Sequence, residues 1–172
     1  GGLILHNWEI TDLSQDLNDY DDIAIGQDFG FNHANAILLL GMKDDNIYIL
    51  KEIYCFEKDT SEIILLADAA DIPKNRQMWC DSAEPDRIKM WTKGGYPRAR
   101  GVDKGGSAGS VKAQIDWLKQ HKIYVHPSCT NTIKELQQWK WKKDERTGEY
   151  LDEPVAFQDD AMAALRYGVE GW

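Results

Sequence analysis

Asp28 lies in a setting where a carboxylate is costly unless something compensates its charge. It belongs to the run IAIGQDFGF (23–31), which has the composition of a first β-strand. Strand alternation places Asp28 on one face with Ala24, Gly26 and Gly30, all of which are small. Glycines at these positions let another backbone or a phosphate group approach closely. The pattern favours a metal-binding or catalytic role over a solvated aspartate at a strand end.

Asp81 ends a second apolar run, QMWCD (77–81), just before a predicted helix. Ligands of open α/β sheets bind at the carboxyl ends of strands, so this position favours chemistry, although helix capping is an alternative. Glu84 and Asp86 follow in the first turn of that helix, where they compensate the helix dipole, and we leave them out of the site.

Asp159 and Asp160 stand where the segment FQDDAMAALRYG (157–168) should begin a helix that is otherwise apolar. An aspartate at a helix start accepts hydrogen bonds from backbone N–H groups and interacts favourably with the helix dipole. One aspartate suffices for capping. The segment alone therefore leaves capping and metal ligation open for this pair.

The pattern of apolar and polar residues predicts the strands and helices that position these acids. Three β-rich runs, 23–31, 34–43 and 46–56, are joined by short polar connections typical of an antiparallel meander. Helices and strands then alternate, and a polar hairpin turning at Thr147-Gly148 precedes the final helix. We expect Thr60 or Ser61 to cap the first helix and Ser128 or Thr130 to cap the fourth. The remaining predicted elements are helix 60–71, strand 77–81, a helix from Pro85 to 94–95, strand 99–104, a Gly/Ser-rich loop 105–110, helix 111–121, strand 123–127 and helix 130–138.

This order predicts an α/β fold with a mixed sheet, formed by the antiparallel meander plus parallel strands, and helices on both faces. The chain has 172 residues, 42% of them hydrophobic, which suits one domain over 23–172. Residues 1–22 end in a polar, acid-rich stretch and are predicted to be a linker or arm.

The sequence shows neither a signal-peptide pattern nor a membrane-spanning run, so we expect an intracellular protein. The three cysteines, Cys55, Cys80 and Cys129, are predicted to be buried free thiols.

An aspartate on the first strand, one at the end of a later strand and one or two opening the final helix match the arrangement of ribonuclease H-like nucleases. Carboxylates so arranged hold two divalent ions about 3.5–4 Å apart. Oxygen ligands suit Mg²⁺ or Mn²⁺ rather than zinc, and no histidine and cysteine cluster competes in the sequence.

The chain resembles the C-terminal nuclease domain of the large terminase subunit of tailed bacteriophages and prophages. The matching stretches are IGQDFGF (25–31), CDSAEPDRI (80–88), DKGGSAGSVKAQIDWL (103–118) and YLDEPVAFQDDAMAALRYG (150–168). The resemblance implies an endonuclease that cuts concatemeric viral DNA during packaging, in the cytoplasm of the bacterial host. It further implies double-stranded DNA, a small terminase subunit and a portal protein as partners, with residues 1–22 leading from an ATPase domain that this sequence lacks.

Residue by residue, the resemblance implies that Asp28 bridges two metal ions, Asp81 binds one, and the pair Asp159/Asp160 supplies the third ligand. We favour Asp160 as that ligand, with Asp159 capping the helix or assisting. The family pattern has a further acid where this sequence has Ala163, so an accessory ligand or supporting group is missing.

The implied reaction is two-metal hydrolysis of a phosphodiester with little sequence specificity, which needs no side-chain nucleophile. The histidines are therefore interpreted as surface or structural residues, with His33 the exception because it follows Asp28 closely; the others are His6, His121 and His126.

The net charge of −9 argues against holding DNA by bulk electrostatics. Lys104, before the Gly/Ser-rich loop, and Lys142 and Lys143, in the hairpin, are the predicted DNA contacts. A resolvase- or transposase-like nuclease of the same fold is one alternative function. The other is a non-catalytic module that docks DNA or the portal, its nuclease disabled by the loss of the acid at 163.

Overall fold

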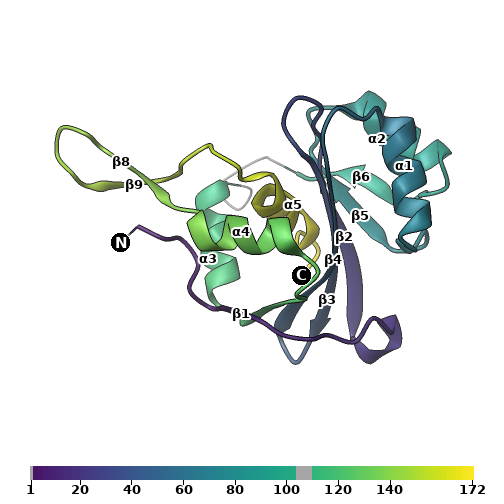
Figure 1. Cartoon of the computed structure of the whole chain (residues 1–172), viewed down its shortest axis with the longest axis horizontal. Coiled ribbons are helices and arrows are strands. Elements are labelled where there is room, and N and C mark those ends of the chain that lie inside the picture. The colour runs from purple at the N-terminus through teal and green to yellow at the C-terminus, as the bar shows by residue number, and fades with distance from the viewer. Residues whose placement is uncertain (1, 104–109) are drawn as a thin grey trace.

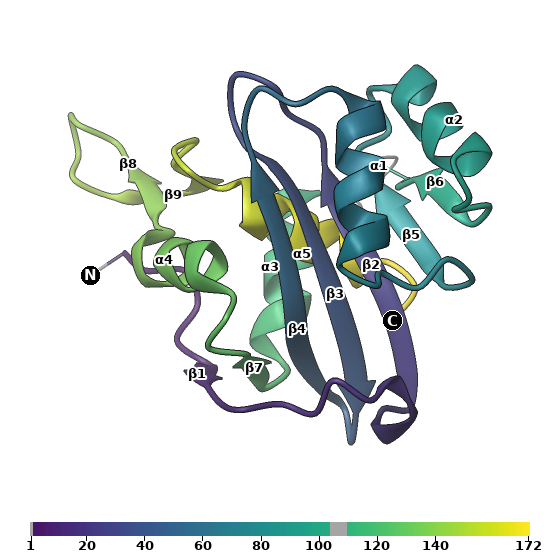
Figure 2. The same cartoon turned by 45° about the vertical axis from the view of Figure 1, so that its right-hand side comes forward.

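The computed structural model describes residues 2–103 and 110–172, which form a seven-stranded sheet with helices on both faces (Figures 1 and 2). Its strands are β1 (Trp8–Ile10), β2 (Asp22–Asp28), β3 (Asn35–Lys43), β4 (Asn46–Cys55), β5 (Gln77–Cys80), β6 (Ala99–Gly101) and β7 (Ile123–Val125). The spatial order is β1-β7-β4-β3-β2-β5-β6. Strands β2, β3 and β4 pair antiparallel, and the other pairs are parallel, as the sequence pattern predicts.

The remaining elements are a short 3₁₀ helix, five α-helices and a two-stranded hairpin within the described residues. They are η1 (Leu17–Asp19), α1 (Thr60–Ala69), α2 (Pro85–Lys93), α3 (Val111–Lys119), α4 (Thr130–Gln138), β8 (Trp141–Lys143), β9 (Tyr150–Pro154) and α5 (Asp160–Gly168). The hairpin pairs β8 with β9, as predicted, and it projects from the body of the protein (Figure 1).

Strand β3 divides the core into two layers by simple alternation. Leu38 and Leu40 pack toward α3, α4 and α5, whereas Ile37 and Leu39 pack toward α1 and α2. Figure 2 shows the two helical layers on opposite sides of the central strands. A strand buried on both faces needs apolar residues at consecutive positions, and ILLL (37–40) supplies them.

Two of the helix caps differ from those predicted. Helix α1 is capped by Asp59, which accepts from the Glu62 N–H while the Glu62 side chain accepts from the Asp59 N–H. This reciprocal pair is a capping box. Thr60 and Ser61, one and two residues further along, lie inside the helix.

Helix α4 begins after Cys129, so Ser128 and Thr130 were both wrong as caps. Its first N–H groups instead donate to a side chain from another element. Glu52 on β4 accepts from the backbone N–H groups of Asn131 and Thr132 at 3.2 and 2.8 Å. A tertiary carboxylate therefore replaces the local cap.

Residues 2–22 pack on the sheet in this structure. Strand β1 pairs in parallel with β7, and Ile4 and Leu5 are buried in the core layer of α3, α4 and α5. The sequence pattern gave no sign of β1, because three residues are too few to show alternation. The boundary at 22/23 and the role of this segment as an arm from an ATPase domain stay predictions.

Within the described ranges, the structure has no helix that is both long and apolar enough to cross a membrane. The three cysteines are free thiols; Cys80 and Cys129 are buried, and Cys55 is half-buried.

Helix α5 lies directly against β2 because small residues meet at their contact. A Cβ atom added to Gly26 would lie 1.9 Å from the carbonyl oxygen of Ala164, and Gly168 packs against the Gly26 backbone from the helix side. Such close contact needs glycine in the strand. The contact sets the position of the first residue of α5 relative to the last residue of β2.

We expect Gly26→Ala to lower the free energy of unfolding by about 3 kcal/mol or more, because α5 must move off the strand to admit a methyl group. Urea unfolding followed by circular dichroism measures the loss. The matched control is Gly171→Ala, whose added Cβ would meet nothing nearer than the Trp79 Nε1 atom at 3.6 Å. Equal stability of the two variants would contradict the close packing of α5.

Candidate metal centre

Two of the predicted acids lie at the ends of neighbouring parallel strands: Asp28 is the last residue of β2, and Asp81 directly follows β5. Gln27 of β2 is in register with Cys80 of β5, and the Asp81 N–H donates to the Gln27 carbonyl at 3.2 Å. Asp28 and Asp81 are therefore the next residues along adjacent strands, which lie about 4.8 Å apart. Asp28 is only 9% exposed, and the Asp81 carboxylate accepts from the Ala83 N–H at 3.0 Å in the loop before α2.

Asp160, the first residue of α5, completes a compact group with Asp28 and His33. One ligand atom from each of the three lies within 4.8 Å of the others, and no further His, Cys, Asp or Glu of the described residues joins this group. His33 Nδ1 lies 2.8 Å from Asp160 Oδ1. Asp81 and Asp159 stand outside the group of three. Proximity to Asp28 in the sequence was the one signal that singled out His33 among the histidines.

The electrostatics of the group penalise negative charge. Burial raises the pKa of the Asp28 carboxyl to about 8, and the negative charges of Asp160 and Asp81 and a hydrogen bond with Asp160 contribute to the increase. Arg166 on α5 opposes this effect. A carboxyl that holds its proton at neutral pH has too little positive charge around it, and a divalent cation would supply that charge.

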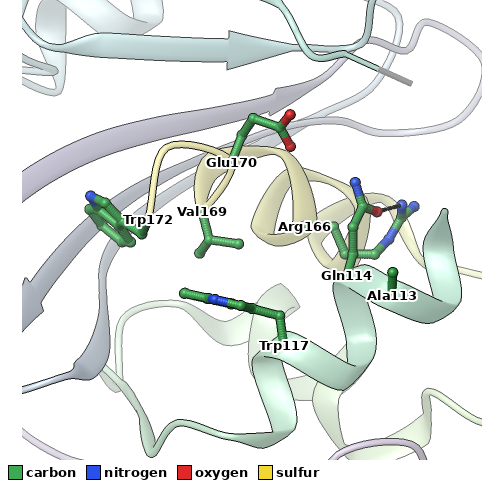
Figure 3. Close-up of a pocket in the computed structure, with 7 residues that line it drawn as sticks. All are labelled: Ala113, Gln114, Trp117, Arg166, Val169, Glu170 and Trp172. Atoms are coloured by element: carbon green, nitrogen blue, oxygen red, sulfur yellow. Dashed lines mark hydrogen bonds between the residues drawn. The ribbon is translucent and has the colours of Figure 1, made fainter. Parts of the chain in front are cut away.

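Arg166 links the metal centre to helix α3, because it acts on the charge of Asp28 and also bonds to a residue of α3. Its guanidinium donates to the Gln114 side-chain oxygen at 2.7 Å, as Figure 3 shows. The two residues line one end of a cavity of about 330 Å³ between α3 and the end of the chain, with Trp117 and Trp172 toward the other end (Figure 3). None of the candidate acids lines this cavity, so it is separate from the metal centre.

Asp159 and Ala163 occupy different surroundings on α5. Asp159 is at the N-cap position, but within the described part of the chain its side chain makes no capping hydrogen bond. Burial, followed by the charge of Asp160, raises the pKa of the Asp159 carboxyl. Ala163 is 7% exposed and packs in a small apolar cluster with Val102 and Tyr167. An acid at 163 would be buried among these groups.

Glu135 caps α5 from outside the helix, and no sequence signal identified it. It is 2% exposed on α4, and it accepts from the Met162 N–H at 3.0 Å and from the Tyr54 hydroxyl at 2.7 Å. Burial raises the pKa of Glu135 to about 7, these hydrogen bonds lower it, and the negative charge of Asp160 raises it. The end of α5 that carries Asp160 is thus anchored by a buried carboxyl group.

Of the lysines predicted to contact DNA, Lys142 and Lys143 lie on strand β8 of the projecting hairpin. Lys142 forms an ion pair with Glu153 at 3.0 Å across the hairpin, and Lys143 lies over the Tyr150 ring. Lys104 falls outside the described residues. Contact of these lysines with DNA stays a prediction.

Comparison with known families identifies the family of this chain. The family model described as "Terminase RNAseH like domain" matches residues 28–171. The chain belongs to this family. The match begins at Asp28 and includes every described acid of the centre. This match confirms the resemblance drawn from the sequence motifs. A separate comparison of this terminase RNase H-like domain with curated proteins finds no match.

Solved structures share the fold of the terminase domain. The nuclease domain of the large terminase g2p of bacteriophage SPP1, determined with bound Mn, is 20% identical with a TM-score of 0.84, and the match covers 96% of each chain. The nuclease domain of the P22 large terminase is 19% identical with a TM-score of 0.68, covering 94% of this chain and 86% of that one. The large terminase of a thermophilic bacteriophage is 19% identical with a TM-score of 0.73; the match covers 96% of this chain but 44% of that one. The α/β ribonuclease H-like fold class is confirmed.

We expect Glu135→Ala to lower the free energy of unfolding by roughly 2–4 kcal/mol, because the Met162 N–H and the Tyr54 hydroxyl both lose their acceptor. Glu135→Gln should lose no more than about 1 kcal/mol, since its amide oxygen can still accept from Met162. Urea unfolding at pH 7 compares the two variants. Equal losses would show that Glu135 stabilises the protein by its charge rather than by capping α5.

The raised pKa of Asp28 predicts a pH-dependent stability of the metal-free protein. Between about pH 4 and pH 8 the folded carboxyl keeps a proton that the unfolded chain releases, so stability falls as pH rises through this window. Asp28→Asn removes this contribution. The Tm of Asp28→Asn should therefore exceed the Tm of the parent by a margin that grows by roughly 5 °C or more from pH 5 to pH 8. This figure takes about 2–4 °C of Tm for each kcal/mol of stability.

Thermal unfolding in EDTA measures this difference. Asp45→Asn is the matched control, because Asp45 is an exposed turn residue with a positive φ that asparagine also tolerates. A constant difference between Asp28→Asn and the parent across the window would contradict the prediction.

Proposed function

We propose that this terminase domain is a metal-dependent DNA endonuclease that cuts concatemeric viral DNA during genome packaging. The reaction is two-metal hydrolysis of a phosphodiester with little sequence specificity. The observation that carries the proposal is the meeting of Asp28, Asp160 and His33 within 4.8 Å, with Asp81 on the adjacent strand. A buried carboxyl with its pKa raised to about 8 fits a site completed by cations.

The donor set suits Mg²⁺ or Mn²⁺. Asp28, Asp160 and His33 would hold one ion, and Asp28 and Asp81 would hold a second, with Asp159 assisting from the start of α5. Carboxylate oxygens are the ligands that Mg²⁺ prefers, and a histidine nitrogen makes Mn²⁺ equally suitable. The related nuclease domain of SPP1 was determined with bound Mn, which supports this choice.

Bound ions would supply a hydroxide nucleophile and would stabilise the charge that develops on the leaving oxygen. The protein positions the reaction through rigid elements: β2 fixes Asp28, and Glu135 fixes the start of α5. Burial of Asp28 keeps bulk water from screening its charge, so the carboxylate is a strong cation ligand once its proton is lost.

The same proposal places the domain within a larger packaging machine. The match covers 44% of the large terminase of the thermophilic bacteriophage, so this chain corresponds to part of such a protein. We propose that an ATPase domain of the same polypeptide, a small terminase subunit and a portal protein hold the double-stranded DNA and raise its concentration at the site. The reaction would take place in the cytoplasm of the bacterial host.

One observation favours a second function, a non-catalytic module that docks DNA or the portal. Ala163 lies in an apolar cluster where the family pattern has an acid, so this position offers no ligand. Asp28, Asp81 and Asp160 retain the three main positions, and for this reason we place the nuclease first.

Nicking of a supercoiled plasmid with Mn²⁺ or Mg²⁺ tests the nuclease. Asp28→Asn, Asp81→Asn and Asp160→Asn should each lower the rate by at least about 100-fold, since even groups that only support metal ligands contribute about 10–100-fold. Asp45→Asn should cut at the parental rate. Absence of metal-dependent nicking by the parent chain with either ion would reject the nuclease and leave the docking module.

A further inference from the structure

Two hollows adjoin the metal centre and share the His33 side chain as a lining residue. The Asp160 hollow, of about 290 Å³, is lined among others by His33, Asp160, Tyr54, Phe56, Asn131 and Lys134. The Asp81 hollow, of about 440 Å³, is lined among others by His33, Asp81, Phe29, Phe31, Glu84 and Arg87. These volumes lie at the lower end of the range of small-ligand sites, roughly 300–1,000 Å³.

Each hollow carries an exposed phenylalanine beside an acid of the centre. Phe56 is 54% exposed and Phe31 is 45% exposed, although most apolar side chains of this size are buried. Tyr54 supports Phe56 through an edge contact with ring centroids 5.8 Å apart. The Glu57 N–H donates to the Phe31 carbonyl at 2.8 Å, so the two segments that carry the rings are joined.

Each hollow also carries a basic side chain. Lys134 is exposed on α4 at the Asp160 hollow, and Arg87 on α2 lines the Asp81 hollow, where it lies over the Phe29 ring and pairs with Glu84. An acid of the centre, an exposed phenylalanine and a basic side chain therefore line the hollow on each side of His33. Aromatic rings combined with cations are typical of sites for single-stranded nucleic acid, where bases stack on rings and cations contact phosphates.

We propose that the site takes a locally unpaired DNA strand. One base stacks on Phe56 in the Asp160 hollow, another stacks on Phe31 in the Asp81 hollow, and the phosphate between them lies at His33. This inference rests on the proposed nuclease function and names its substrate more closely. Bases in an intact duplex present their edges in the grooves while their faces are covered by stacking, so an exposed ring can reach a base face only where the strand has opened.

The charge of the chain argues against an intact duplex held by its phosphates alone. Proteins that hold duplex DNA by its phosphates need many clustered lysines and arginines, whereas this chain has a net charge of −9. Stacking of bases on rings adds binding energy beyond the phosphate contacts, so two rings would supplement the few cations of the site on a short unpaired segment.

Fluorescence of 2-aminopurine tests the proposal. Short single-stranded oligonucleotides with this base near the centre, and the same sequences as duplexes, are titrated with the parent chain in Ca²⁺. Gel electrophoresis confirms that they stay intact. The parent should quench the single strand. Phe56→Ala and Phe31→Ala should each weaken its binding by about 5- to 150-fold, the range that roughly 1–3 kcal/mol per stacked base corresponds to.

Phe157→Ala is the matched control, because Phe157 is 62% exposed yet lines neither hollow. Its binding should equal that of the parent. Unchanged affinity and quenching in Phe56→Ala and Phe31→Ala would overturn the proposal, as would tighter binding of duplex than of single strand by the parent. Plasmid nicking in parallel separates the two claims: nicking without an effect of the phenylalanines leaves the nuclease standing and rejects the opened strand.

Discussion

The contact between α5 and β2 is the constraint on which the rest of the centre depends. Gly26 lets the backbone of Ala164 and Gly168 approach the strand, and this approach fixes the helix along the face that also carries Asp28. Helix α5 begins at the end of the sheet where β2 and β5 end, so Asp160 meets Asp28 there. A larger residue at 26 would separate the acids while leaving every one of them in the sequence.

Bringing these acids together is unfavourable without a cation, and the structure shows where the opposing interactions come from. The two core layers hold β2 between α5 and the pair α1 and α2. Glu135 satisfies an N–H at the start of α5, although its own burial raises its pKa to about 7. Packing and capping therefore maintain a cluster whose electrostatics oppose it, which is expected of a site that is organised before its ligand binds.

The local sequence was more informative about the candidate acids than about the residues that support them. Asp28, Asp81 and Asp160 stand at positions defined by strand alternation, a strand end and a helix start, which are local signals. His33 lies in a loop, and only its closeness to Asp28 in the sequence distinguished it. Glu135 sits in TNTIKELQQ, where a polar helix face looks the same whether it is solvated or buried. Glu52 caps α4 from a distant strand, and β1 has only three residues, so both required the tertiary structure.

In the proposed nuclease, the same charges would couple cation binding to substrate binding. A phosphodiester is an anion, and the acids of the centre repel it until positive charge is present. Protonation of Asp28 would relieve part of this repulsion, but it would also remove the carboxylate that is proposed to bridge the two ions. Replacement of that proton by a bound cation relieves the repulsion and keeps the ligand. If the centre binds a cation as proposed, the raised pKa of Asp28 links the release of its proton to cation binding, and both would favour the binding of DNA.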